Sequence, residues 1–480
     1  MTKNPAERFI PILKNPIFWA FALPFLYWTY LFFSTTMDIE HDAFTYKELA
    51  LGIYKGGWPG FFQNEPKNVP LYPLIISLSM RIADLLSISY LKVQTCIQIL
   101  ILFASQVLLY KILTLLRIQR NVVAAVIFYF GFSPAIVNSA FSLFCEIITY
   151  PLILALLLTF VSAWQHVLKN QSRKIFISSL FLVILFVLLA LVRPIFEYVL
   201  ILFVLVFLCF SFYFSIKRQW KKSINILLLI LTTFFVFRFA LIPYRQMNYK
   251  YNGYRSLVST GSFSVYGNTV TRTEKLTTRE ALTFLANIPG DNVCQKIFNK
   301  EECSSWLFYK KISSNKIKEL QAQGMSNNQI DSMLYKLSLK NIYRNPFQYA
   351  FLTIAEGAKM FFGESTQLSY VTYPPWLSKI FDFLPFKNGI RLFAFLLTIF
   401  STFYVARYLW KNKRKLFGIN QNENNEMLFL FFILALILIN IILHAPFYIL
   451  VRYALPIAPL YLLAIAFTFQ KLIFKTRQED

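Results

Sequence analysis

The sequence predicts an all-α polytopic membrane protein with about ten transmembrane helices. Of its 480 residues, 57 % are hydrophobic and only 15 % are charged, and the mean hydropathy is +0.52. A soluble domain of this length carries more charge, because its surface must face water. Apolar runs close to the ~20 residues needed to cross a bilayer recur along the chain.

Basic residues predict the orientation of these runs. The 48 Lys and Arg residues outnumber the 23 Asp and Glu residues, for a net charge of +25. They lie in short clusters between apolar runs, which is typical of cytoplasmic loops and argues against a nucleic-acid partner. The clusters occupy residues 3–14, 117–120, 169–174, 217–222, 411–415 and 471–477. If all are cytoplasmic, both termini are cytoplasmic and the number of spans is even.

Ten apolar runs give this even number of spans, a requirement that we call the charge parity. They are residues 17–35, 93–116, 122–144, 147–164, 175–192, 196–216, 224–242, 390–410, 427–443 and 453–469. The first is too long and too aromatic for a signal-peptide core, so we expect it to be retained. Two further runs, 71–87 and 347–362, would break the parity if they crossed, so we interpret them as interfacial helices on the outer surface.

This topology predicts three regions. Residues 1–243 form a membrane module with an outer first loop at 37–92, and residues 388–480 form C-terminal transmembrane helices. Between them, residues 244–387 form an extracytoplasmic region that is mixed but mostly helical, with helical character at 315–343. The polar sequence from residue 244 to 345 indicates no particular role.

Carboxylates cluster where the first span ends. Asp38, Glu40 and Asp42 alternate directly at the expected membrane surface. Asp42 and Tyr46 are four residues apart, so they share one face of a helix. A solvated acidic loop would give the same run, and a catalytic carboxylate is the alternative interpretation.

The motifs that follow this loop resemble those of the GT-C superfamily of membrane glycosyltransferases. That superfamily includes protein O-mannosyltransferases, the lipid A aminoarabinose transferase and oligosaccharyltransferases. The resemblance covers most of the chain outside the region from residue 243. It rests on D-x-x-x-Y-x-x-x-A from Asp42, P-L-Y-P-L from Pro70, Ser133-Pro134 before Phe144-Cys145-Glu146, Leu191-Val192-Arg193-Pro194, and R-Y-x-x-P-x-x-P from Arg452.

The resemblance implies transfer of a sugar from a polyprenyl-phosphate donor to a lipid, glycan or protein acceptor. The reaction is expected on the extracytoplasmic face of a membrane, here a bacterial inner membrane. Asp42 is then the general base, with Tyr46 and Glu146 as further catalytic residues. Arg452 is the leading ligand of the donor phosphate, because a guanidinium matches phosphate oxygens. Tyr453, Arg193 and Lys67 are further candidates for that role.

Several alternatives stay open. Arg452 could reach the lipid headgroups without any ligand, and Arg193 could pair with Glu197 four residues later. Asp42, Glu40 and Glu146 could hold a Mg²⁺ or Mn²⁺ ion, and the sequence does not decide whether a metal is used. The rival functions are a polysaccharide polymerase or ligase of another fold, a lipid-linked sugar flippase or transporter, and a catalytically inactive scaffold of the same fold.

Two cysteines predict a disulfide in the extracytoplasmic region. Cys294 and Cys303 flank eight residues, enough for the chain to turn back on itself. An oxidising compartment outside the membrane would favour the bond. Two free thiols that happen to lie close in sequence are the alternative.

Overall fold

A computed structural model confirms the all-α polytopic fold. It describes residues 14–63, 66, 68–258, 261–288, 291–303, 305–364, 368–413, 421–447 and 449–473. Within these ranges, nine helical stretches are long and apolar enough to cross a membrane, or ten when the bent pair α6–α7 counts as one span. The helices involved are α2 (Pro16–Ser34), α5 (Tyr90–Leu115), α6 (Arg120–Phe132), α7 (Pro134–Phe141), α8 (Glu146–Leu168), α9 (Ser172–Val192), α10 (Ile195–Ile216), α11 (Trp220–Ala240), α21 (Leu384–Lys411), α22 (Gln421–His444) and α23 (Ala458–Ile473).

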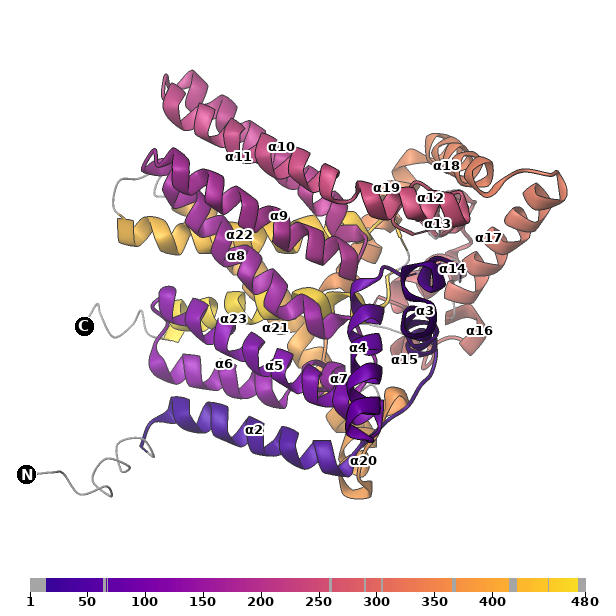
Figure 1. Cartoon of the computed structure of the whole chain (residues 1–480), viewed down its shortest axis with the longest axis horizontal. Helices are drawn as coiled ribbons and strands as arrows, with labels where there is room; N and C mark the ends of the chain where they lie inside the picture. Colours follow the sequence, from indigo (N-terminus) through magenta and orange to yellow (C-terminus); the bar gives the residue numbers. More distant parts are fainter. Residues whose placement is uncertain are drawn as a thin grey trace, which may run out of the picture.

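The remaining helices gather at one end of the bundle, which we call the loop-rich end (Figure 1). The turns α5–α6, α8–α9 and α10–α11 lie at the opposite, basic end and carry the clusters at 117–120, 169–174 and 217–222. The helices of the loop-rich end are α3 (Asp42–Gln63), α4 (Leu71–Leu86), α12 (Ile242–Asn252), α13 (Gly261–Thr273), α14 (Thr278–Ala286), α15 (Asp291–Cys294), α16 (Lys300–Cys303), α17 (Ser305–Ala322), α18 (Asn327–Arg344), α19 (Pro346–Gly357) and α20 (Pro375–Asp382).

The two runs interpreted as interfacial form short helices. Helix α4 has 16 residues and α19 has 12, both below the ~20 residues of a span. In Figure 1, α4 runs across the ends of the neighbouring spans rather than alongside them. On α19, Phe347, Phe351 and Ile354 are exposed at helical spacing, which suits contact with a bilayer surface.

Proline and glycine break three of the expected helices. The run 122–144 bends by 46° between α6 and α7, where Ser133 caps α7 and Pro134 occupies its first turn. The helical stretch around 315–343 consists of α17 and α18, separated at Gly324, whose φ of +76° is accessible to glycine. The last span starts as the 3-10 helix η4 (Val451–Ile457), which contains Pro456.

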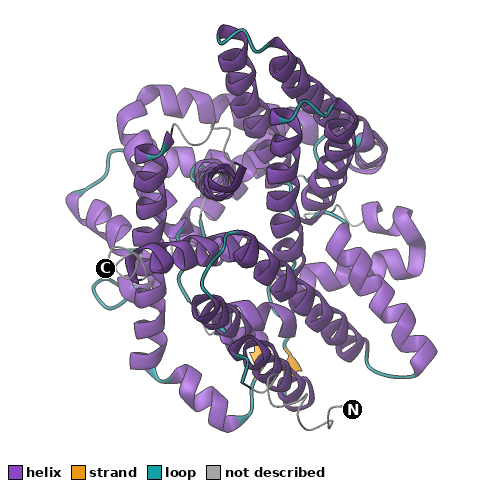
Figure 2. Ribbon diagram, turned by 90° about the vertical axis from the view of Figure 1, so that its left-hand side faces the viewer, coloured by secondary structure: helices purple, strands orange, loops and turns teal. Residues whose placement is uncertain are grey.

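A two-stranded sheet ties the first loop to the region before α20. Strand β1 (Thr36–Met37) pairs antiparallel with β2 (Val371–Thr372), so that Thr36 faces Thr372. The hydroxyl of Thr372 donates to Asp38 at 2.9 Å, so this carboxylate helps to hold the strands together. The 3-10 helices η1 (Ala358–Met360) and η2 (Leu368–Tyr370) lie on the approach to β2. Figure 2 shows the strands as the orange segment among helices.

Burial separates central spans from peripheral ones. In the span Val451–Ile473, 83 % of the apolar stretch is buried, and in Glu146–Leu168 67 %, against 22 % in Pro16–Ser34. An apolar helix that is exposed on this scale faces lipid, whereas a buried one packs among its neighbours. Arg452 and Glu146 therefore stand near the starts of the two most enclosed spans.

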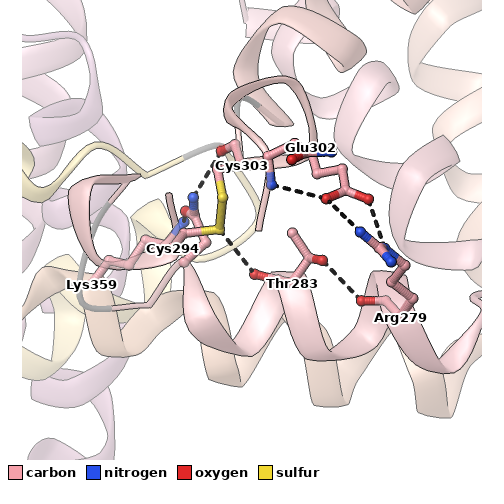
Figure 3. Close-up of a disulfide and its surroundings, with 8 residues drawn as sticks. Arg279, Thr283, Cys294, Glu302, Cys303 and Lys359 are labelled. Carbon is pink, nitrogen blue, oxygen red and sulfur yellow. Dashed lines mark hydrogen bonds and ion pairs between the residues drawn. A yellow bond between two sulfur atoms is a disulfide. The ribbon is translucent and has the colours of Figure 1, made fainter. Parts of the chain in front are cut away.

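Cys294 and Cys303 form a disulfide at the loop-rich end, with Cα atoms 5.7 Å apart (Figure 3). This is the pair that the spacing predicts. The sulfur of Cys294 lies 3.8 Å from the carbonyl oxygen of Thr283 on α14, so the bond packs against that helix. Closing so short a loop contributes on the order of 2–3 kcal/mol in the chain-entropy account.

The disulfide and the charge pattern together predict which end is outside. Both sulfurs are fully buried, so labelling is better directed at the exposed Gln321 on α17 and at the exposed Gln219 at the basic end. In a background where Cys96, Cys145 and Cys209 are replaced by serine, a membrane-impermeant maleimide should label Gln321→Cys in intact cells or spheroplasts. It should label Gln219→Cys only after lysis, and the reverse pattern would invert the topology.

Candidate functional site

A cavity of about 210 Å³ opens at the loop-rich end, where four segments distant in sequence meet. We call it the Asp42 cavity. It lies between the start of α3, the start of α8, the α9–α10 turn and η4. Its lining consists of Asp42, Tyr46, Asn68, Val69, Phe144, Glu146, Val192, Arg193, Pro194, Ile195, His444, Arg452 and Tyr453. Six of the residues that the sequence suggests for the site are among them.

Asp42 and Arg452 form an ion pair across this cavity, although 410 positions separate them in the sequence. Asp42 is the first residue of α3, where the helix dipole favours a negative charge. His41 before it adopts a left-handed φ of 48°, so the chain turns sharply into the helix. The Asp42 side chain stays 50 % exposed, whereas that of Arg452 is 17 % exposed. The carboxylate is thus reachable from the cavity while the guanidinium is held in the wall.

The Arg452 guanidinium retains donor capacity beyond this ion pair. Its Nε is buried and has no hydrogen-bond partner among the described residues. A buried donor without a partner costs about 1–3 kcal/mol. The guanidinium lies 5.4 Å from the centre of the Phe144 ring, which supports one face of it. Phe144 in turn contacts Tyr370, at a centroid distance of 4.6 Å, from the segment leading into β2.

Glu146 and Arg193 form a second ion pair, with Nη2 and Oε1 2.7 Å apart. Their side chains are only 4 % and 15 % exposed. The local pairing of Arg193 with Glu197 does not occur in the structure. Glu197 instead accepts from Arg238 at 2.8 Å and from Arg245. Arg193 sits where Pro194 interrupts α9 and α10, so its extended backbone directs it to the start of α8 rather than along its own helix.

Tyr46 belongs to a buried hydrogen-bonded network behind the two ion pairs. Its hydroxyl donates to the Cys145 sulfur at 3.1 Å, and Cys145 lies 3.6 Å from Glu146 Oε2. Burial raises the pKa of the Tyr46 phenol well above its usual value, and Cys145 and Glu146 add to the effect. Burial likewise raises the pKa of the Cys145 thiol to about 11. At neutral pH both groups therefore keep their protons.

Tyr453 and His444 complete the cavity next to Arg193. The Arg193 guanidinium lies 5.4 Å from the centre of the Tyr453 ring, and the centre of the His444 ring lies 5.8 Å from the same ring centre. His444 Nδ1 is 2.9 Å from the backbone oxygen of Asn440, which fixes the imidazole orientation. Tyr453 thus acts as a platform for the arginine, and its role at a phosphate stays a prediction.

The described residues give no support to a metal ion held by Asp42, Glu40 and Glu146, so that role stays a prediction. Within the ranges that the structure describes, no three His, Cys, Asp or Glu residues group closely enough to hold an ion. Glu40 is exposed and does not line the cavity. Asp42 and Glu146 each face an arginine, whose charge opposes a cation at the same place. Lys67, suggested as a phosphate ligand, lies outside the described residues.

Three lining residues were missed by the sequence reasoning. His444 carries no role in the prediction from sequence, although it ends a span eight residues before Arg452. Phe144 enters that prediction only as part of a motif, and Asn68 does not enter it. Phe144 lies two residues before Glu146, and Asn68 lies two residues before Pro70. These positions were the signal in the sequence that both could belong to the site.

Comparison of the chain with protein-family models, with curated proteins and with solved structures finds no match.

The buried Glu146–Arg193 pair gives a stability prediction. Glu146→Gln leaves the Arg193 charge buried without a counter-charge, so we expect a loss of about 3–5 kcal/mol. Thermal unfolding in detergent should show a lower midpoint for this variant than for Glu146→Gln combined with Arg193→Gln. A single variant as stable as the native protein would mean that the pair is not buried as described.

Proposed function

We propose that this chain is a glycosyltransferase that moves a sugar from a polyprenyl-phosphate donor to an acceptor hydroxyl. The observation that carries the proposal is the Asp42 cavity itself. It brings an accessible carboxylate against an arginine that has an unused donor, next to a second buried arginine. Membrane association suits a donor whose polyprenyl chain stays in the bilayer.

The proposed sugar transfer requires a base for the acceptor proton and cationic groups for the phosphate. The acceptor oxygen attacks the anomeric carbon as Asp42 accepts the hydroxyl proton, and the bond from that carbon to the phosphate oxygen breaks. The donor phosphodiester carries one negative charge. The polyprenyl phosphate that departs is a monoester and carries two. Arg452, with Arg193 close by, stabilises the added charge. Before the donor binds, Arg452 pairs with Asp42. A donor phosphate that contacts Arg452 weakens this ion pair.

Two features support an extracytoplasmic active site. The cavity lies at the end that also bears the disulfide, and disulfides persist in oxidising compartments. The opposite end bears the basic turns, as cytoplasmic loops do. A bacterial inner membrane with the site facing the periplasm meets both conditions.

The rival functions fit the geometry less well. A flippase needs a path for a polar headgroup across the bilayer, typically between repeats with charged groups in mid-span. Here the two ion pairs of the cavity stand at one end of the bundle. A polymerase or ligase of another fold would not require a carboxylate of the first loop at its phosphate site.

The test is cleavage of the donor. Purified protein in detergent is mixed with lipid-linked sugars and an acceptor fraction, both extracted from the native envelope. The appearance of unglycosylated polyprenyl phosphate is followed by mass spectrometry. We expect its release to depend on both the enzyme and the acceptor fraction. Transport of intact lipid-linked sugar across proteoliposomes, without cleavage, would favour a flippase instead.

A further inference from the structure

A second and larger cavity lies in the part of the loop-rich end that the sequence left without a role. Its volume is about 510 Å³, within the range of roughly 300–1,000 Å³ typical of small-molecule sites. We call it the Asn268 cavity. Residues of α13, α14, α16 and α19 line it, including Cys303 of the disulfide.

The disulfide and a buried ion pair shape one wall of this cavity. Asn287 donates to the backbone oxygen of Cys303 at 2.8 Å and accepts from Lys359 at 2.6 Å (Figure 3). Lys359 also pairs with Glu356 at 3.0 Å, and both side chains are 3 % exposed. At the rim, Arg279 binds Glu302 at 2.8 Å. These contacts preorganise the wall without using any residue of the Asp42 cavity.

The backbone that follows α22 contacts lining residues of the Asn268 cavity at three described positions, Ala445, Phe447 and Ile449. Arg272, which lines the Asn268 cavity, donates to the backbone oxygens of Ala445 at 2.7 Å and Phe447 at 3.0 Å. Glu356, in the same lining, accepts from the backbone nitrogen of Ile449 at 3.2 Å. Ala445 directly follows His444 of the Asp42 cavity, and Ile449 lies two residues before the start of η4, which carries Arg452. Arg272 and Glu356 therefore join the lining of the second cavity to backbone next to the first.

Asn268 points to the chemistry of that ligand. Its side chain lines the cavity and is only 3 % exposed, yet its amide nitrogen has no hydrogen-bond partner among the described residues. Buried amides are almost always paired, because an unmet donor is costly. An oxygen acceptor supplied by a ligand would satisfy it.

The remaining lining favours an uncharged, hydroxyl-rich ligand. It contains five carboxylates and four basic side chains, so it gives no excess positive charge for an anion. Threonine hydroxyls and amides alternate there with Leu276, Phe284 and Leu352. Such a mixture offers hydrogen bonds to sugar hydroxyls and an apolar surface for the carbon–hydrogen face of a sugar ring.

We propose that the Asn268 cavity binds a neutral saccharide, namely the non-reacting part of the acceptor glycan. Naming it as the acceptor rests on the proposed glycosyltransferase function, whereas the saccharide site itself does not. Binding energy from a remote part of a substrate helps to position its reacting group. The contacts of Arg272 and Glu356 with Ala445, Phe447 and Ile449 would relate the two sites.

Saccharide binding can be measured without turnover. Purified protein in sugar-free nanodiscs is tested by saturation-transfer NMR against neutral di- and trisaccharides of glucose, galactose, mannose and N-acetylglucosamine, alongside uronic-acid disaccharides. We expect at least one neutral saccharide to bind. Asn268→Leu preserves shape but removes the donor, so binding should weaken about tenfold. Its thermal stability should equal or exceed the native value, since the unmet donor is gone.

Glu48→Gln serves as the control, because Glu48 is exposed and lines neither cavity, and it should bind the same saccharide as the native protein. Four results would overturn the proposal: binding of uronic acids alone, no binding of any neutral saccharide at millimolar concentration, undiminished binding by Asn268→Leu, or loss of binding in Glu48→Gln. Donor cleavage is measured separately. Saccharide binding without cleavage would reject the proposed transferase and keep the site, and cleavage without binding would do the opposite.

Discussion

Replacing Asp42 with asparagine is expected to lower sugar transfer by roughly 10²–10⁴-fold, the usual contribution of a positioned general base. The amide keeps the shape of the side chain at the start of α3 and still contacts Arg452, but it cannot take a proton from the acceptor. Donor binding should persist, because the Arg452 charge is then less neutralised. The measurement is the initial rate of polyprenyl phosphate release at saturating donor.

Glu48→Gln is the matched control for this variant. Glu48 lies on the same helix, is exposed and does not line the Asp42 cavity, so the same change of charge should leave the rate unaltered. Full turnover by Asp42→Asn would remove Asp42 from the catalytic role. An equal loss in both variants would point to the charge of the helix rather than to the carboxylate.

Arg452→Ala is expected to raise the donor concentration needed for half-maximal rate about ten- to hundredfold. Hydrogen bonds to a charged partner contribute roughly 1.5–3 kcal/mol, and 1.4 kcal/mol corresponds to a factor of ten. Arg452→Lys should recover only part of this loss, because an ammonium lacks the fork of donors that matches phosphate. Asp42 is half exposed, so removing its partner should cost little stability.

Arg238→Ala provides the comparison for Arg452. Arg238 is another arginine at the loop-rich end and pairs with Glu197, which Arg245 also holds. It does not line the Asp42 cavity, so its loss should leave the donor requirement unchanged. If Arg452→Ala leaves the donor concentration for half-maximal rate unchanged, Arg452 is an interfacial anchor and does not bind the phosphate.

The position of the site along the bundle could be predicted from the sequence. Asp42, Glu146, Arg193 and Arg452 each stand at the end of an apolar run, and charge parity assigns those ends to one face. Apolar runs are reliable signals because every backbone group in a bilayer must be satisfied within its own helix. The disulfide could also be predicted from the sequence, because its cysteines are only nine positions apart.

The pairing of those residues could not be predicted, because hydropathy does not state which helix lies beside which. The nearest carboxylate in sequence to Arg193 is Glu197, yet its partner is Glu146, brought close by the packing of α8 against the α9–α10 turn. The Asn268 cavity could not be predicted from the sequence for a related reason. It depends on how several short helices stack, and their sequences carry no long periodic pattern.

If the protein consumes a polyprenyl-phosphate-linked sugar, cells that lack it should retain that lipid. The amount of each lipid-linked sugar in such cells can be measured by mass spectrometry. We expect one such lipid to accumulate, the native gene to restore its level, and Asp42→Asn not to restore it. An unchanged lipid profile, or full restoration by Asp42→Asn, would show that the protein does not act on such a lipid through Asp42.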